Sequence, residues 1–274
     1  MKNLLLPILA IAALPLIPTD AAAQFYVVAD DGSVLYRMES GTPAYVTFEN
    51  PNPYNGTVGT AVNLGLPSGT LWADHNIGAT NPEDYGDYYS WGETATKETY
   101  DWSTYFDTND DGATFGKYNN DDGKTELETS DDVASQTWGG KWQMPTRAMI
   151  EELKSQCYWV WTTTYNGKSV SGYIVYMAKT DADKGARVTS GSSPSPAYDV
   201  ATDPHLFLPA AGARWGSELY NAGSYGFYWS RSLAPDDSKN AYNLHFRSGD
   251  VWGYCTSSRD YGFAVRPVVL PAAE

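Results

Sequence analysis

The stretch that decides the fold runs from Ser224 to Val268 and reads SYGFYWSRSL (224–233), NAYNLHFRSGDVWGYC (240–255) and DYGFAVRPV (260–268). Apolar and polar side chains alternate in short runs, and Gly and Asp break the runs. This pattern is typical of antiparallel strands with one face packed and the other exposed. We therefore expect a β-meander that displays one face, with the rest of the chain as its scaffold.

Side chains in a strand alternate between two faces, which divides the run NAYNLHFRSGDV into two sets. The set predicted to be buried is Tyr242, Leu244 and Phe246. The set predicted to be displayed begins with Asn243, His245 and Arg247. Further along, we predict a turn at 248–250, a returning strand at 251–254 and a polar loop at 255–261. The residues expected to close the core are Phe263, Val265 and Val268.

One clear helix is predicted upstream, in TRAMIEELKSQC (146–157). Thr146 is placed to cap its N-terminus, and apolar residues recur at three- and four-residue spacing on one face. These residues are Met149, Ile150, Leu153 and Cys157. On this stripe Cys157 is expected to be a buried thiol rather than a nucleophile.

The other elements are predicted to be short strands. Asn166-Gly167 lies between two runs of high β-propensity and predicts a hairpin over 158–178. Two short strands are expected around the turn Pro67-Ser68-Gly69, and a further strand at 206–209. The predicted fold class is therefore α+β, mostly antiparallel β with one clear helix.

The chain begins MKNLLLPILAIAALPLIPTDAAAQ, which has the features of a secretory signal cleaved after Ala23. Its apolar run is too short to span a bilayer and is interrupted by proline, so we expect no membrane insertion after cleavage. In FYVVADDGSVLYRM (25–38), Asp30-Asp31-Gly32 predicts a hairpin, followed by a third strand in 43–48. The chain is expected to be exported, to the periplasm, the cell surface or the medium.

The expected organisation has three parts. Residues 1–23 form the signal peptide, and residues 24–58 form a β extension with a linker rich in Asn, Pro and Gly. Residues 59–274 form the main domain, with residues 224–268 as its display region.

The formal net charge is −15, and it stays −15 when the signal is removed with Lys2 and Asp20. Such a field repels nucleic acid and anionic membrane surfaces, so neither is expected as a partner. Cys157 and Cys255 are the only cysteines, which leaves a disulfide between them open. Stabilisation by packing is expected to matter more than covalent bridging.

A segment within the acidic region from Asp101 to Asp132 partly matches a calcium loop. Asp107, Asn109, Asp111 and Gly112 fit the opening positions of an EF-hand loop, where oxygen ligands alternate before a sharp turn. The twelfth position is Tyr118 rather than the required Glu, so we favour a solvated acidic loop. Calcium is the one candidate ion, and no other cofactor is expected.

Six blocks of the chain, in this order, resemble a known family. They are VNLGLPSGTLWA (62–73), EDYGDYYSWGE (83–93), WGGKWQMPT (138–146), LFLPAAG (206–212), AGSYGFYWSRS (222–232) and GFAVRPV (262–268). They resemble the Fibrobacter succinogenes major paralogous domain, which is common in secreted proteins of gut Bacteroidetes. The resemblance covers roughly residues 61–270 and implies a C-type-lectin-like fold, related to that of formylglycine-generating-enzyme-like domains.

In the commonest form of that family the display region is rich in Asn, and it resembles the variable region of proteins diversified by a retroelement. Error-prone copying of template adenines turns Asn codons into several other codons, though not into those for Lys, Glu, Gln, Met or Trp. Trp252 lies outside the reachable set. The reachable residues present are His245, Arg247, Asp250, Gly253, Tyr254, Cys255, Thr256, Ser257, Ser258, Asp260 and Tyr261. The resemblance thus implies a variable protein of a diversity-generating retroelement.

These observations predict a binding module: an exported, adhesin-like protein whose ligand is a protein or a glycan on another cell or surface. Tyr, Trp, Arg and Ser on a rigid scaffold resemble the composition of a paratope. The predicted ligand-binding residues are Asn243, His245, Arg247, Asp250, Trp252, Tyr254, Ser257, Asp260 and Tyr261.

Two alternatives stay open. The first is a structural subunit of a surface appendage, with 25–48 as a segment that pairs with another chain. The second is an enzyme of the formylglycine-generating type, which the resemblance implies only through the fold. That chemistry needs a reactive cysteine pair, and no motif surrounds Cys157 or Cys255. The three histidines are scattered and no hydrolase or P-loop motif is present, so we expect no catalytic residue and no enzyme.

Overall fold

The computed structural model describes residues 25–28, 34–38, 56–108, 110–119, 121–189 and 198–271. The chain divides into two units, residues 1–53 and residues 54–274. In the first unit, β1 (Phe25–Val28) pairs antiparallel with β2 (Val34–Met38), which confirms the predicted hairpin. The predicted signal peptide and the predicted strand in 43–48 lie outside the described residues.

The meander predicted at 224–268 is present as a three-stranded antiparallel sheet. Its strands, in order, are β12 (Tyr225–Leu233), β13 (Asn240–Arg247) and β14 (Asp250–Ser258). The predicted loop at 255–261 is wrong in its first half, because β14 continues to Ser258. The pairing of β14 with β13 shifts register once. Trp252 pairs with His245, and Cys255, three residues later, pairs with Asn243, which is two residues from His245.

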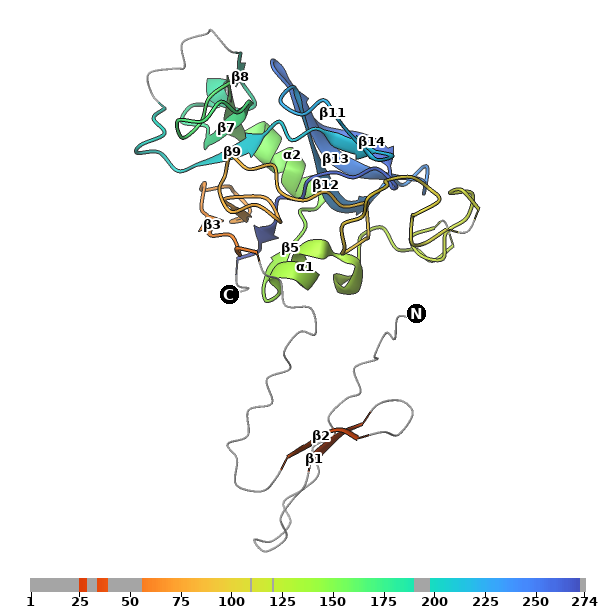
Figure 1. The fold of residues 1–274 in the computed structure, drawn as a ribbon. Coiled ribbons are helices and arrows are strands. Elements are labelled where there is room, and N and C mark those ends of the chain that lie inside the picture. Colours follow the sequence, from red (N-terminus) through yellow and green to blue (C-terminus); the bar gives the residue numbers. More distant parts are fainter. Residues whose placement is uncertain are drawn as a thin grey trace, which may run out of the picture. The chain divides into compact units, whose positions relative to one another are not determined.

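A second sheet lies across the core from the meander (Figure 1). Its order is β8 (Arg187–Val188), β6 (Cys157–Thr162), β7 (Gly172–Met177) and β9 (His205–Pro209). The predicted hairpin at Asn166-Gly167 is confirmed as the β6–β7 connection, and both turn residues have positive φ, 49° and 75°. Asn and Gly tolerate this left-handed region better than other residues do.

A third sheet joins the two ends of the second unit. Its order is β3 (Ala61–Val62), β4 (Leu71–Ala73), β15 (Val268–Val269) and β5 (Trp142–Gln143). The two strands predicted around the turn at Pro67 are β3 and β4. A separate hairpin that the sequence did not predict pairs β10 (Ala213–Trp215) with β11 (Glu218–Tyr220).

The predicted helix is α2 (Arg147–Gln156), and Thr146 caps it by accepting a hydrogen bond from the Met149 amide at 3.2 Å. Ile150 and Leu153 are buried, as predicted. Cys157 is buried too, but it belongs to strand β6 rather than to the helix, because the chain turns extended there.

The prediction of one helix missed α1 (Val133–Trp138). Its cap is the buried Asp132, whose Oδ1 accepts hydrogen bonds from the Ala134 and Ser135 amides at 2.9 and 3.1 Å. Two short 3₁₀ turns, η1 (Thr129–Asp131) and η2 (Asp181–Asp183), complete the list of helical segments in the described residues. No helix in the described ranges is long and apolar enough to cross a membrane.

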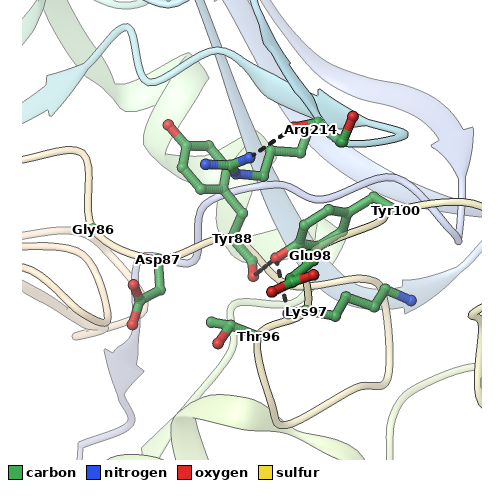
Figure 2. Close-up of a pocket in the computed structure, with 9 residues that line it drawn as sticks. Gly86, Asp87, Tyr88, Thr96, Lys97, Glu98, Tyr100 and Arg214 are labelled. Carbon is green, nitrogen blue, oxygen red and sulfur yellow. Dashed lines mark hydrogen bonds between the residues drawn. The ribbon is translucent and has the colours of Figure 1, made fainter.

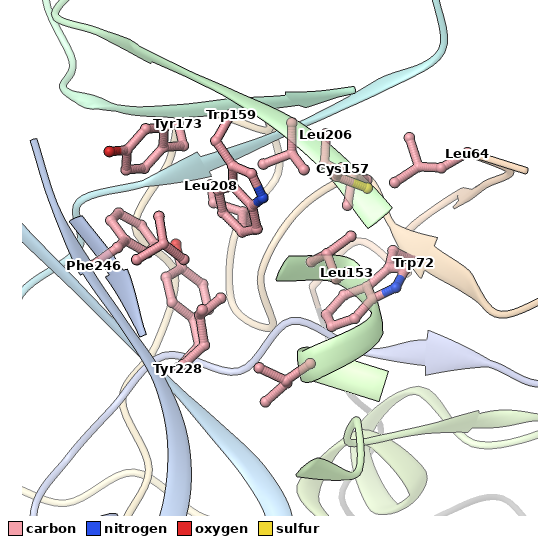
Figure 3. Packing of buried hydrophobic residues seen from close by; sticks show 14 of the residues in the cluster. Leu64, Trp72, Leu153, Cys157, Trp159, Tyr173, Leu206, Leu208, Tyr228 and Phe246 are labelled. Carbon is pink, nitrogen blue, oxygen red and sulfur yellow. The ribbon is translucent and has the colours of Figure 1, made fainter. Parts of the chain in front are cut away.

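The main core lies between α2, the β6–β7–β9 sheet and the inner face of the meander. Figure 3 shows Leu153 of the helix, Trp159 of β6 and Phe246 of β13 converging on this space. Phe246 and Leu244 are buried as predicted, whereas Tyr242, on the central strand β13, is only half-buried, with the Arg147 guanidinium carbon 4.3 Å from its ring centroid. The observed class is α+β and rich in antiparallel sheet. A second buried cluster that includes Trp229 and Ala241 covers part of the opposite face of the meander, and the rest of that face is partly exposed.

Candidate binding surface

The outer face of the meander carries a group of aromatic side chains. We call it the aromatic face, and its members are Trp215, Tyr220, Tyr225, Phe227, His245, Trp252 and Tyr261. Trp215 and Tyr220 come from the β10–β11 hairpin and are 57% and 44% exposed. The other members are half-buried. Two exposed rings grouped with five half-buried ones are unusual at a protein surface, because large apolar side chains favour burial.

Three of these rings form a row across the three strands of the meander. Phe227 is the register partner of His245, and His245 is the register partner of Trp252. Their ring centroids are 4.3 Å apart for Phe227 and His245 and 4.9 Å apart for His245 and Trp252. The row is rigid because each ring stands on a paired strand and packs against its neighbour.

The second part of the face lies on the β10–β11 hairpin. The Trp215 ring is 6.0 Å from Tyr220 and 6.0 Å from Tyr261. The buried Phe263 links this part to the row, because its ring contacts both Tyr261 and Phe227, at 6.3 and 5.0 Å. The aromatic face is therefore connected by ring contacts from Tyr220 to Trp252.

Buried tryptophans continue from the face into a second buried cluster. Trp229 is fully buried, stacks on Phe263 at 4.2 Å and donates its indole hydrogen to the Tyr89 carbonyl at 2.8 Å. Trp91 is also fully buried and donates to the Ser230 carbonyl at 2.8 Å. These hydrogen bonds satisfy the indole groups and fix the ring positions.

An exposed ion pair borders the row at its open edge. Arg247 Nε lies 2.9 Å from Asp250 Oδ2, and the guanidinium carbon lies 5.6 Å from the centroid of Trp252. The Arg247 Nη1 group also donates to the Tyr225 hydroxyl at 3.4 Å. Both charged side chains are close to half exposed. Because exposed ion pairs contribute little to stability, these groups are free to exchange partners with a ligand.

His245 is held neutral within the row. Burial between the neighbouring rings lowers the pKa of its imidazole, and the nearby Arg247 charge lowers it further. The ring therefore acts as an aromatic member of the face at neutral pH rather than as a cation.

The structure brings together four of the predicted site residues, His245, Arg247, Asp250 and Trp252. Tyr261 lies on the same face through its contact with Trp215. Of these five, strand alternation predicted the placement of His245 and Arg247.

The predicted display of Asn243 and Asp260 is wrong, because they are 0% and 2% exposed. The amide of Asn243 donates to Ser257 Oγ of the next strand at 3.0 Å, and Ser257 itself is half-buried. Asp260 accepts a hydrogen bond from Ser258 and is covered by the segment around Ser90, whose hydroxyl donates to the Asp260 carbonyl at 2.9 Å. Burial raises the pKa of the Asp260 carboxyl.

Tyr254 is exposed, but it lies on the other side of the sheet. The ammonium of Lys154, on helix α2, is 4.7 Å from its ring centroid. A side chain at Gly253 would also meet α2, since its Cβ would lie 2.7 Å from Glu151 Oε1. The cause is the register shift in β14, which breaks strict alternation between Trp252 and Cys255.

The predicted calcium loop has other contacts. Asp107 Oδ2 accepts the Lys117 amide at 2.9 Å and lies 3.5 Å from Arg259 Nη2. Asp111 is exposed in a turn with φ 53°, and Asn109 lies outside the described residues. The described residues contain no cluster of His, Cys, Asp and Glu arranged to hold a metal. Calcium binding stays a prediction.

Arg259 is a buried structural residue that the sequence did not reveal. Its side chain is 0% exposed, its guanidinium carbon lies 4.2 Å from the Phe115 ring and 4.9 Å from the Trp91 ring, and Nη1 donates to the Ser238 carbonyl at 2.9 Å. The Nε group donates to the Tyr105 hydroxyl at 3.0 Å. Arg259 thus ties the acidic loop to the end of β14.

The two cysteines are free thiols. Cys157 is fully buried, and desolvation raises its pKa to about 12. Cys255 is half-buried, and its pKa is raised by burial as well. Neither thiol has the lowered pKa that a nucleophilic cysteine needs.

A separate pocket of about 510 Å³ lies beside the β10–β11 hairpin. Figure 2 shows Asp87, Lys97, Glu98 and Arg214 around it, with Arg214 above the Tyr88 ring at 5.3 Å. Consecutive strand residues point to opposite faces, so Arg214 and Trp215 place the pocket and the aromatic face on opposite sides of the hairpin.

Sequence reasoning missed Trp215, Tyr220, Tyr225 and Phe227. The alternation in SYGFYW (224–229) already placed Tyr225 and Phe227 on one face, which was the usable signal.

No family model matches the chain, and no curated protein and no solved structure matches it.

Proposed function

We propose that the chain is an exported, adhesin-like binding protein that captures its ligand on the aromatic face. One observation carries this proposal: exposed and half-buried rings from the hairpin and from all three strands of the meander are linked by ring contacts, through the buried Phe263, on a rigid support. The ligand is a protein or a glycan on another cell or surface. The role is binding rather than catalysis.

The energetics of exposure support this reading. Leaving a large aromatic side chain in water forgoes about 1.5–3 kcal/mol of burial free energy, so a connected group of such side chains indicates a surface that is covered in use. Trp, Tyr and Arg also dominate the residues that contribute most to binding. Trp215, Trp252 and Arg247 are residues of these types at the surface.

The family resemblance adds the biological setting to the proposal. The blocks quoted from the sequence support a paralogous domain of C-type-lectin-like fold in a secreted protein. Within that setting the contact residues are positions of a variable region, and His245, Arg247 and Asp250 lie among the codons open to diversification. Their placement beside Trp252 gives that variation direct access to a ligand.

A subunit of a surface appendage is the second candidate, and one observation favours it. Within the described residues, β1 and β2 pair only with each other, and the outer edge of a two-stranded pair can accept a strand of another chain. Such an edge is the usual site of strand addition between chains. Sedimentation of the mature chain over a hundredfold range of concentration separates the two, since strand exchange requires oligomers that grow with concentration.

Binding to an array of defined glycans and purified extracellular matrix proteins tests the proposed function. We expect wild-type chain to bind one class of probe and Trp252→Ala to lose that binding. The matched control is Tyr254→Ala, which removes an exposed ring from the other side of the sheet. Unchanged binding by Trp252→Ala and by Trp215→Ala, with both variants folded, would reject the proposal.

A further inference from the structure

The two parts of the aromatic face, the hairpin part and the row, carry one tryptophan each. Trp215 is the most exposed large apolar side chain among the described residues, at 57%. Trp252 ends the row on β14, and ring contacts through Tyr261, Phe263, Phe227 and His245 connect the two. Each part of the face therefore presents one flat indole, and the buried Phe263 lies between the two parts.

The row between its two borders is one side chain wide. On one side lie Trp229 and Asn243, which are both 0% exposed. On the other side stand the polar tips of Tyr225, Arg247 and Asp250. A protein partner needs a broad patch of roughly 800 Å² on each side, whereas a strip suits a linear chain that lies along it.

Each tryptophan has a charged group beside it. Glu218 is the register partner of Trp215 across the hairpin, and it is exposed. Arg247 and Asp250 stand beside Trp252. The carboxylates of Glu218 and Asp250 accept hydrogen bonds, and the guanidinium of Arg247 donates them. A ligand group that can both donate and accept hydrogen bonds therefore finds a partner beside each tryptophan.

Sugar hydroxyls are groups of this kind, and the flat face of a pyranose presents C–H bonds that pack on an aromatic ring. Small, rigid aromatic platforms bind such rings without ordering cost on the protein side. The net charge of −15 disfavours a polyanionic ligand.

We propose that the ligand is a linear neutral glycan that lies along the aromatic face, with Trp215 and Trp252 as two separate stacking platforms. This inference rests on the proposed function and narrows its ligand. Trp91 and Trp229 are fully buried and out of reach of a ligand, whereas Trp215 is exposed and Trp252 is half-buried on the aromatic face.

Titration calorimetry with β-linked oligosaccharides of glucose, xylose and mannose of increasing length tests the inference. Affinity should rise with length until both platforms are covered. Trp215→Ala and Trp252→Ala should each lower the affinity for long oligosaccharides about tenfold, the loss expected for one stacked ring. A short oligosaccharide should lose affinity with only one of the two variants, and Tyr254→Ala should bind like wild type.

The outcomes separate the two proposals. If a matrix protein binds through Trp252 and no neutral glycan binds, the glycan inference is wrong and the proposed function stands. Binding restricted to polygalacturonate, or affinity independent of chain length, also overturns the inference. If no glycan or protein binding responds to Trp215→Ala or Trp252→Ala while circular dichroism shows folded variants, both proposals fail.

Discussion

The imidazole of His245 stacks on the ring of Phe227, with centroids 4.3 Å apart and planes inclined by 17°. This pair is the middle of the aromatic face. It joins two neighbouring strands and places a titratable ring where a ligand would rest. Protonation of His245 would place a second positive charge beside Arg247 in the middle of the face. The lowered pKa of His245 keeps the ring neutral at neutral pH.

His245 should make the chain less stable in acid. Its pKa in the folded chain lies below the ordinary value of 6.5, so the folded chain binds this proton more weakly than the unfolded chain does. Stability from the neutral ring is complete above that ordinary value and is lost as pH falls through the folded pKa. Urea unfolding at pH 7 and pH 5 should show a smaller loss for His245→Phe than for wild type. Equal losses would contradict a lowered pKa.

Arg259 should be essential for stability. Removing a fully buried guanidinium leaves its carbonyl and carboxylate partners unpaired, which costs about 3–5 kcal/mol. We therefore expect Arg259→Ala to lower the free energy of unfolding by that amount, measured by denaturation with guanidinium chloride. Arg247→Ala is the control, since its exposed ion pair should contribute less than about 1 kcal/mol. Similar losses for the two variants would show that the ring contacts of Arg259 do not stabilise the fold.

Gly226 should not tolerate a side chain. A Cβ at this position of β12 would overlap the ring of Phe246 on β13. We expect Gly226→Ala to lower stability by about 1–3 kcal/mol through overpacking. Phe246→Leu should relieve part of this cost, so the double variant should be more stable than the two single losses predict. Strict additivity in thermal unfolding would mean that the two residues do not meet.

The thiols should react unequally. Cys157 is buried with its pKa raised to about 12, and Cys255 is half-buried. With Ellman's reagent at pH 8, the native chain should expose one thiol slowly, and the second only after denaturation. Cys255→Ser should abolish the slow native phase. Rapid reaction of both thiols would instead favour the formylglycine-generating type of chemistry.

Local patterns predicted the elements that local physics determines. The capped helix at Thr146, the hairpin at Asn166-Gly167 and the meander all have short-range signals, and all are present. The helix α1 was missed because it is short and its cap, Asp132, is also fixed by the distant Met144 amide at 2.9 Å. The strands β5 and β8 have two residues each and exist only because of partners far along the chain.

Strand alternation predicted half of the candidate site and then failed for a structural reason. It placed His245 and Arg247 correctly, since pairing is regular there. Beyond Trp252 the register shift moves Tyr254 to the helix side, and no local signal marks a bulge of this kind. The burial of Asp260 depends on a segment 170 residues earlier, at Ser90, which packing alone brings into contact.

Carbene footprinting, with and without the probe that binds most tightly on the array, tests the central claim most directly. The aromatic face predicts that bound ligand protects Trp215, Trp252 and Tyr225 from labelling. It also predicts unchanged labelling of Tyr254 and of Phe106, which are exposed rings outside the face. Protection confined to Tyr254 or Phe106, with Trp215 and Trp252 labelled as in the free chain, would contradict the account.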